Sequence, residues 1–446
     1  MKPLKASTTS SDMVPIPCST GEEEIGLKLY YSCSRGSGGH IKTLAEDFVV
    51  EEISDPPPEK EGGRFTIATV TSRNWEMNRL VRQLARSLHI SRHRIGFAGT
   101  KDKRAVTTQL MSFEIEPQAL MELNLKDVAI SGIYRAARPI QIGDLIGNRF
   151  TVLVRDCTLQ GNNLKDDLQF CLSQLEELGG FPNYFGVQRF GVTRPITHLV
   201  GRHIIHGEFK EAVIKYLSYP SPFEDEELFA FRRELREPDG RTDLLSEFPP
   251  GMNFEKTIVE HLSRRPEDYA GALRQLPANL QMMFVHAYQS YMFNLMLSER
   301  MRRGIPINSP EVGDLVLAVN GKRVPVHERP VEVTESNIDL VRAQVEAGKA
   351  FVSGLLFGTD SVFASGPMGE IERKVVESEG IESKDFLVPP IPHCSSRGSR
   401  RELLCPFEGL SLDVGEDSYL ISFSLTKGNY ATCLLREFMK SEMHHY

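Results

Sequence analysis

The chain is too long to fold around a single hydrophobic core. It has 446 residues, whereas domains usually contain about 100–200 residues and single cores rarely grow beyond about 250–300. Charged residues make up 25% of the chain and apolar residues 40%. This is the composition of a globular protein and argues against disorder of the whole chain. We therefore expect two or three folded domains.

Several classes of protein are excluded because their patterns are missing. No run of 18 or more apolar residues occurs, so we expect no transmembrane helix and no membrane partner. The N-terminal residues lack the apolar core of a signal peptide, which predicts a cytoplasmic protein. The seven cysteines are scattered without a C-x-x-C pair, so neither a disulfide framework nor a metal site is expected. Phosphate-loop, dinucleotide-binding, zinc-protease and serine-hydrolase motifs are also missing.

A charged loop between two predicted strands is the most distinctive local pattern. Apolar residues recur with helical spacing in 73–89, and the runs 95–98 and 106–115 are predicted to be strands. The loop between these strands has the sequence GTKDKRA at 99–105. Because a strand anchors each end, we expect the tip of this loop to be held rigidly.

Further elements are predicted on both sides of the loop. Residues 1–40 are rich in Ser, Thr and Gly and are interpreted as a flexible N-terminal segment. The stretch 224–247 is rich in acidic residues, and we assign it no function. The other predicted elements are strands at 47–53, 150–154 and 419–425, and helices at 164–178, at 278–303 and up to residue 439.

The net charge of −8 conceals an uneven distribution. Residues 73–104 contain nine Lys and Arg residues against Glu76 and Asp102, so this window carries +7 and the rest of the chain −15. Such a basic block is suited to bind the phosphates of a nucleic acid. The same residues could form the solvated face of a helix, and charge alone does not separate the two interpretations. The nine cations are Arg73, Arg79, Arg82, Arg86, Arg92, Arg94, Lys101, Lys103 and Arg104.

Asp102 is a lone carboxylate among these cations. Lys101, Lys103 and Arg104 flank it, and nearby positive charge favours the ionised form of a carboxylate. An ionised carboxylate is suited to act as a nucleophile or a base. Asp is also a common turn residue because its side chain bonds to the local backbone, and spacing alone favours this second interpretation.

A longer set of motifs narrows the possible functions of the chain. The string GFAGTKDKRAVTTQ at 96–109 resembles the signature of the TruD family of tRNA pseudouridine synthases. Four further segments resemble motifs of that family in the same order, and the resemblance extends over about residues 38–440. These segments are Lys42 with DFVVE at 47–51, GNRFT at 147–151, NYFGVQRFG at 183–191, and KGNYAT at 427–432 followed by Arg436 and Glu437.

The resemblance implies both an activity and a fold. It implies an enzyme that isomerises a uridine of tRNA, typically uridine 13, to pseudouridine without a cofactor or a metal. The implied fold is α+β, with a catalytic domain at 41–182 and 405–446 that is built on a mixed, largely antiparallel sheet with flanking helices. A second α+β domain would be inserted at 183–404. Because no heptad pattern suggests a dimer, we expect a monomer.

The resemblance also implies the residues of an active site. Asp102 would be the catalytic carboxylate, Lys42 would pair with it, and Phe150 would stack on a uridine that has left its base stack. Without the motifs, Lys42 would be an ordinary strand-edge lysine and Phe150 a core residue. The expected substrate-binding residues are Lys42, Phe48, Asn148, Phe150 and Tyr430.

Each of the other assignments has an alternative. Asn148 could bind the edge of the base or brace the Asp102 loop, but it could also be a turn residue before a strand. Phe48 and Tyr430 would pack beside the site. Arg189 could contact phosphate or form a structural salt bridge. The expected RNA-phosphate contacts come from Arg79, Arg82, Arg86, Lys101, Lys103, Arg104 and Arg189.

Two other functions remain possible at the level of sequence. An RNA-binding protein or tRNA chaperone could share the fold, and Asp102 distinguishes it because binding alone does not need a carboxylate there. A methyltransferase or another RNA-modifying enzyme would need a cofactor-binding glycine loop, which is missing. The sequence does not choose the chemical route by which the glycosidic bond would break.

Overall fold

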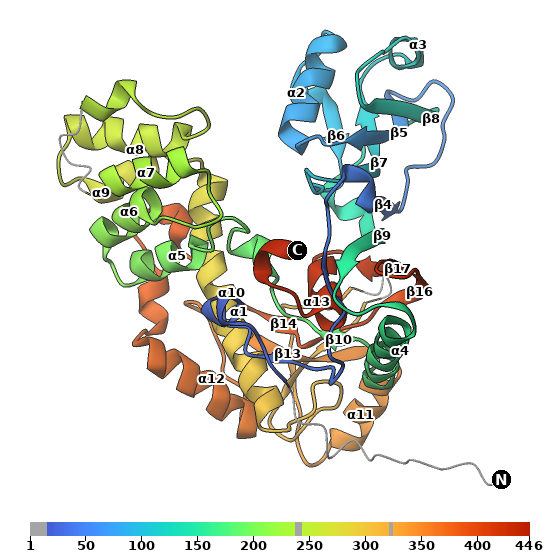
Figure 1. Cartoon of the computed structure of the whole chain (residues 1–446), viewed down its shortest axis with the longest axis vertical. Coiled ribbons are helices and arrows are strands. Elements are labelled where there is room, and N and C mark those ends of the chain that lie inside the picture. The colour runs from blue at the N-terminus through green and yellow to red at the C-terminus, as the bar shows by residue number, and fades with distance from the viewer. Residues whose placement is uncertain (1–15, 237–242, 321–323) are drawn as a thin grey trace. The chain divides into compact units, whose positions relative to one another are not determined.

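The protein is described here from a computed structural model that covers residues 16–236, 243–320 and 324–446. The chain divides into two compact units (Figure 1). The sheet unit comprises Ser34–Gly180, Pro406–Ser441 and His445–Tyr446. The helical unit comprises the described part of Met1–Cys33 together with Phe181–Cys405 and Glu442–His444. The predicted boundaries at 182–183 and 404–405 lie beside these divisions.

A nine-stranded sheet forms the centre of the sheet unit. Its strands are β3 (Gly38–His40), β4 (Phe48–Ser54), β5 (Phe65–Arg73), β6 (Ile95–Phe97), β7 (Val106–Phe113), β8 (Val128–Ala136), β9 (Leu145–Cys157), β16 (Glu408–Val414) and β17 (Tyr419–Thr426). The main order is β16-β17-β9-β4-β7-β5-β8, with β3 paired to β9 and β6 to β7. All pairs are antiparallel except β4 with β7. The predicted α+β fold with a mixed, largely antiparallel sheet is therefore confirmed.

Helices flank this sheet, and their apolar spacing explains how they pack. They are α2 (Met77–Ser87), α3 (Pro117–Met121), α4 (Gly161–Leu178) and α13 (Ala431–Met439). In α2, Met77, Leu80, Val81 and Leu84 are buried against apolar side chains of β5 and β7. The side chain of Glu76 caps α2 by accepting hydrogen bonds from the first turn. The predicted helices at 73–89 and 164–178 correspond to α2 and α4.

The helical unit is assembled around one long helix. Its helices are α1 (Thr20–Glu24), α5 (Thr197–Ile205), α6 (Phe209–Ser218), α7 (Glu226–Glu234), α8 (Asn253–Arg264), α9 (Tyr269–Arg274), α10 (Ala278–Arg302), α11 (Ile338–Glu346) and α12 (Gly366–Glu379). The helix α10, predicted at 278–303, is buried around most of its circumference. Figure 1 shows α5 and α12 along it, and both pack against it. Apolar residues of these helices form one contiguous core.

Short strands and 3-10 helices complete the chain. A four-stranded sheet in the helical unit has the order β12-β11-β13-β14, and β10 pairs with β15. The strands are β1 (Ile16–Pro17), β2 (Leu29–Tyr30), β10 (Phe181–Pro182), β11 (Leu315–Ala318), β12 (Val331–Glu332), β13 (Ala350–Leu356), β14 (Ser399–Glu402) and β15 (Leu404–Cys405). The 3-10 helices are η2 (Ala45–Asp47), η3 (Arg92–Arg94), η4 (Ile142–Asp144), η5 (Val187–Arg189), η6 (Asp243–Ser246), η7 (Ser383–Phe386), η8 (Pro392–Cys394) and η9 (Met443–His445).

The interpretation of residues 1–40 as a flexible segment is wrong for the part that the structure describes. In 16–40, β1 pairs with β2 and β3 pairs with β9. Ile25, Leu27 and Tyr30 are buried, so this segment contributes apolar side chains that the Ser- and Gly-rich composition concealed. Residues 1–15 lie outside the described residues.

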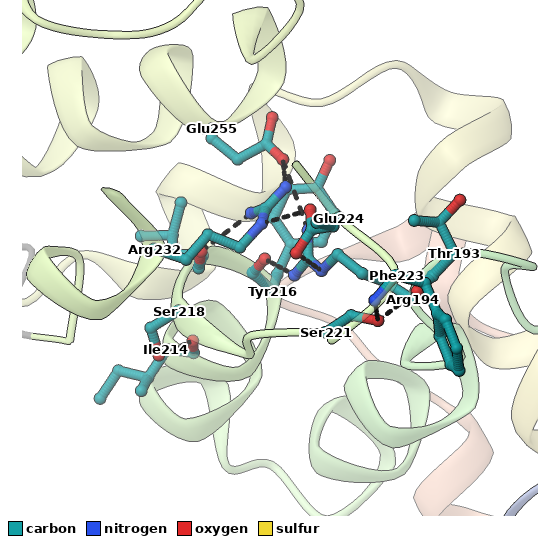
Figure 2. Close-up of polar contacts among 11 residues, drawn as sticks. Thr193, Arg194, Ile214, Tyr216, Ser218, Ser221, Phe223, Glu224, Arg232 and Glu255 are labelled. Atoms are coloured by element: carbon teal, nitrogen blue, oxygen red, sulfur yellow. Dashed lines mark hydrogen bonds and ion pairs between the residues drawn. The ribbon is translucent and has the colours of Figure 1, made fainter. Parts of the chain in front are cut away.

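A group of buried charges fixes the start of the acidic stretch in the helical unit (Figure 2). Arg232 donates from Nε to Glu224 Oε1 at 2.8 Å and from Nη2 to Glu255 Oε1 at 3.1 Å. Arg194 donates from Nη2 to the carbonyl oxygen of Tyr216 at 2.6 Å. Burial and the neighbouring Arg232 lower the pKa of Arg194 to about 10. Arg194 also forms ion pairs with Glu224 and Glu255, each at 3.7 Å. These charges therefore tie α7 and α8 to the segment before α5.

Candidate active site

The sheet brings three of the sequence motifs side by side. Strand β4 lies between β9 and β7. Val50 of β4 pairs with Phe150 on one side and with Thr107 on the other. The segments 47–51, 147–151 and 96–109 are therefore neighbours, although they are distant in sequence. Strand β17, which leads to the last motif, pairs with the other edge of β9.

Asp102 lies in the loop that connects β6 to β7. Both strands belong to the sheet, and β6 pairs with the far end of β7. Ala98 and Ala105, at the two ends of the loop, are buried. The prediction of a loop anchored by two strands is confirmed, and the residues between the two alanines form its tip.

Lys42 and Asp102 form an ion pair at this tip. Lys42 Nζ donates to Asp102 Oδ1 at 3.3 Å, with 12% of the lysine side chain and 39% of the aspartate side chain exposed. The same ammonium lies 4.2 Å from the centroid of the Phe48 ring, a cation–π contact. Lys42 has a φ of 61°, a left-handed conformation that is uncommon for a residue other than glycine. Such local strain is often found at functional sites.

A second ion pair holds the segment that carries Lys42. Asp47 accepts from Arg155 Nη2 at 2.7 Å and Nε at 3.0 Å, and also from the backbone N–H of Leu44 at 2.8 Å. The hydrogen bond from Arg155 lowers the pKa of Asp47. The sequence places Asp47 in a motif but gives no sign of this role. Its partner on β9 follows the GNRFT motif and has no local signal.

The expected aromatic residues form a buried cluster. Phe150 stacks on Phe423 with ring centroids 5.4 Å apart, and it meets Phe48 in an edge-on arrangement with ring centroids 6.0 Å apart. Phe48 is buried, and Phe150 is only 6% exposed. This arrangement corresponds to the core-packing interpretation of Phe150 and corrects the expectation that its ring is open for stacking on a base. Phe423 is not among the site residues expected from the sequence.

Asn148 lies on β9, and Tyr430 follows β17, the strand that pairs with β9. Asn148 is directly opposite Glu52 of β4 and Leu425 of β17. Its Oδ1 is buried and accepts no hydrogen bond from the described residues. Tyr430 is half-buried at the N-cap of α13, a few residues after β17 ends. The structure thus brings Asn148 next to the β4 motif and places Tyr430 beyond the end of the strand that pairs with β9.

Lys101 is not available for a phosphate contact, which corrects the expectation from sequence. Its Nζ donates to Glu52 Oε2 at 2.7 Å, and 5% of the lysine and 1% of the glutamate side chain are exposed. The physical reason is that Lys101 turns toward β4, where a buried carboxylate neutralises it. Lys103 and Arg104, which follow in the loop, are exposed.

The basic face of α2 is open to solvent as predicted. Arg79, Arg82 and Arg86 are all exposed on the side of the helix opposite its apolar stripe. No carboxylate of the described ranges forms an ion pair with any of them. Arg79 lies over the ring of Trp75, 5.4 Å from its centroid. These three arginines can therefore form charge-assisted contacts with an external anion.

Arg189 belongs to the helical unit and has partners there. Its Nε donates to Ser290 Oγ at 3.2 Å, and its guanidinium lies 5.5 Å from the centroid of the Phe185 ring. Arg401 lies 4.3 Å from the same ring. Arg189 is thus held by a hydroxyl and an aromatic ring, and neither contact is the salt bridge that the sequence also allowed.

Two other kinds of feature are missing from the described ranges. No group of three or more His, Cys, Asp or Glu side chains there is arranged to hold a metal ion. No helix in the same ranges combines the length and apolar character that crossing a membrane requires.

Comparison with known proteins agrees with the motifs. The family model described as tRNA pseudouridine synthase D (TruD) matches residues 24–438. The chain is 41% identical over 428 residues to a probable tRNA pseudouridine synthase D of Methanococcoides burtonii, covering 94% of this chain and 97% of the relative. It is 40% identical over 409 residues to the protein of that name in Thermococcus gammatolerans, covering 91% and 95%.

A solved structure is also similar. The crystal structure of a putative tRNA pseudouridine synthase D from Methanosarcina mazei superposes with a TM-score of 0.83 at 36% identity. The match covers 96% of this chain and 100% of that one. The chain belongs to the tRNA pseudouridine synthase D (TruD) family.

Proposed function

We propose that the protein isomerises uridine to pseudouridine in tRNA, at uridine 13, with Asp102 as the catalytic carboxylate and no cofactor. The single observation that carries the proposal is the ion pair between Asp102 and Lys42 at the tip of an anchored loop. Both residues lie within the range that the family model matches. The partner is then tRNA, and the expectations of a monomer and of a cytoplasmic location stay predictions.

The proposed reaction is an isomerisation in which the base stays with its ribose. The bond between N1 of uracil and C1′ of ribose breaks, the base rotates, and C5 bonds to C1′. C5 then loses its proton, while N1 gains one. A carboxylate can start this sequence by attacking C1′, by attacking C6 of the base, or by taking a proton from C2′. All three routes require an ionised carboxylate that the substrate can reach.

Asp102 has the properties that these routes require. More than a third of its side chain is exposed, so a nucleotide can approach it. The charge-assisted hydrogen bond from Lys42 restricts its orientation and balances its charge. The left-handed backbone of Lys42 and the contact of its ammonium with Phe48 restrict the lysine in turn. Preorganised charges of this kind are a main source of enzymatic rate enhancement.

Supporting roles follow for the neighbouring residues. Phe150, held between Phe48 and Phe423, would form an apolar surface beneath the Asp102 site. There it would exclude water without stacking on the uracil. The buried Oδ1 of Asn148 accepts no hydrogen bond from the described residues. Asn148 would therefore brace the loop or accept a hydrogen bond from the N3–H of a uracil that enters the site. Tyr430 would line the site from the start of α13.

Phosphate contacts would come from the exposed cations. Arg79, Arg82 and Arg86 lie on one face of α2, and Lys103 and Arg104 follow Asp102 in its loop. Contacts of this kind position an RNA without reading its sequence. Arg189 stays a weaker candidate because a hydroxyl and a ring already hold it.

The test compares the native protein with Asp102→Asn on unmodified tRNA. Pseudouridine is mapped by primer extension, which stops next to the nucleotide after carbodiimide treatment. We expect a stop for uridine 13 with the native protein and none with Asp102→Asn, although both should bind tRNA in a gel-shift assay. The catalytic proposal would be refuted if the native protein gave no stop, or if the variant gave an equal stop. Binding without any stop would instead support an RNA-binding protein or chaperone.

A further inference from the structure

A buried ion pair fixes the residue that precedes Asp102. Lys101 Nζ donates to Glu52 Oε2 at 2.7 Å, and neither side chain is more than 5% exposed. The second carboxylate oxygen, Glu52 Oε1, accepts a hydrogen bond from Ser54 Oγ. Both oxygens of the carboxylate are therefore engaged, and the ammonium of Lys101 has little contact with solvent.

This ion pair is adjacent to the pair that holds the proposed catalytic carboxylate. Lys101 and Asp102 are consecutive, and so are the regions of their partners, because Glu52 lies within β4 and Lys42 lies in the segment that leads into that strand. Two successive loop residues of opposite charge are thus tied to the same segment by separate partners. Each cation has its own anion, so the four formal charges cancel.

The separation of the two pairs is important because Lys101 could otherwise pair with Asp102. A buried ion pair adds little net stability, since desolvation of both ions offsets their attraction, and a preference for one arrangement is a better explanation for keeping it. If Glu52 lost its charge, Lys101 would keep its own in a place with little solvent. The adjacent carboxylate of Asp102 would then attract it and turn away from Lys42.

We infer that Glu52 is a positioning residue for the proposed reaction. By binding Lys101 it keeps that cation away from Asp102, so that the catalytic carboxylate stays paired with Lys42 alone and open to the substrate. Glu52 touches neither the substrate nor Asp102 in this role and acts only through Lys101. The inference rests on the proposed function.

A double-mutant cycle tests the inference. Glu52→Gln, Lys101→Met and the double variant are assayed for single-turnover pseudouridine formation with saturating protein, and tRNA affinity is measured separately. Glu52→Gln should lower the single-turnover rate about tenfold or more, since misplacing a reacting group by about 1 Å can cost about 100-fold. Its tRNA affinity should change less than about twofold. In the Lys101→Met background the same change should lower the rate less than about threefold, because the misplaced cation is gone.

Asp167→Asn is the matched control for loss of a buried carboxylate. Asp167 on α4 is in the same unit, 5% exposed, and accepts hydrogen bonds from the backbone N–H groups of Arg35 and Gly36. This variant should unfold at a lower temperature but keep the native single-turnover rate when it is assayed below that temperature. A merely structural role for Glu52 would make Glu52→Gln behave in the same way.

The outcomes separate this inference from the proposed function. Equal effects of Glu52→Gln in both backgrounds, or a native rate for Glu52→Gln in an active protein, overturn the inference and leave the function intact. An inactive native protein overturns both. If Glu52→Gln does not fold, the double variant, which buries no lone charge, decides. A folded double variant within about tenfold of the native rate supports the inference, and one more than about 100-fold slower overturns it.

Discussion

The ion pair between Asp47 and Arg155 predicts that its two members contribute differently to the stability of the fold. Asp47 is 2% exposed and Arg155 38%, so the two ends of the same pair lie in different environments. Asp47→Asn removes the charge-assisted hydrogen bonds from a guanidinium that can turn to water. We expect a loss of about 2 kcal/mol in the free energy of unfolding, within the range for hydrogen bonds to charged groups.

Removing the guanidinium of Arg155 should be more destabilising than removing the charge of Asp47. Arg155→Met leaves a buried carboxylate whose one remaining hydrogen-bond donor among the described residues is the N–H of Leu44. Removing one member of a buried pair typically costs about 3–5 kcal/mol. The chain contains one tryptophan, Trp75, in the sheet unit. Urea unfolding followed by its fluorescence therefore reports this unit. If Asp47→Asn were as destabilising as Arg155→Met or more so, the argument from burial would be refuted.

The same pair predicts a difference in acid stability. The hydrogen bond from Arg155 lowers the pKa of Asp47 in the folded protein. Its stabilising contribution is therefore complete above the unfolded value of about 3.9 and is lost as the pH falls through the lower folded value. The native protein should lose stability more steeply than Asp47→Asn below about pH 4. Parallel pH profiles for the two proteins would show that the carboxylate is not held as described.

Three further predictions concern other parts of the chain. Lys42→Met should lower the single-turnover rate about 100-fold with little change in tRNA affinity, and Lys42→Arg should lose less, as measured by the carbodiimide assay. Changing Arg79, Arg82 and Arg86 to Glu should reduce the slope of log Kd against log salt by about one for each phosphate that the variant no longer binds, as measured by anisotropy with labelled tRNA. Arg232→Met should destabilise the helical unit by about 3–5 kcal/mol because it leaves two buried carboxylates without their main partner. Calorimetry should detect that loss, while the tryptophan transition of the sheet unit stays unchanged.

Local patterns predicted those elements whose apolar residues repeat along the chain. The helices α2, α4 and α10 follow from spacing because each buries a continuous face or most of its circumference. The strand that follows the loop at 99–105 is predicted by its β-branched residues. Strand β5 was not predicted, although its run of β-branched residues favours a strand. The N-terminal strands were also missed, since two-residue strands have too few residues to show alternation.

The environments of the site residues could not be predicted because their partners are distant in sequence. Lys101 looked like a surface cation, and its neutralising carboxylate lies 49 positions earlier. Phe150 begins a run that fits both a core strand and an open ring, and Phe423, from the other end of the chain, decides between them. Motifs identified the pairing of Lys42 with Asp102 only through the family resemblance. Pairings between distant strands are set by the whole sheet and not by any window of sequence.

Ion pairs with distant carboxylates engage some of the cations in the basic block at 73–104. Of the nine cations in 73–104, Arg73, Arg94 and Lys101 form ion pairs with carboxylates outside the window. The other six form no ion pair with a carboxylate of the described ranges. A phosphate footprint drawn from this block therefore has at most six cations. Each bound phosphate contributes about 0.9 to the salt slope on B-form DNA and about 0.7 on a single strand. With coefficients of this size, the block accounts for a slope of about 4 to 5 at most. A steeper measured slope would require cations from elsewhere in the protein.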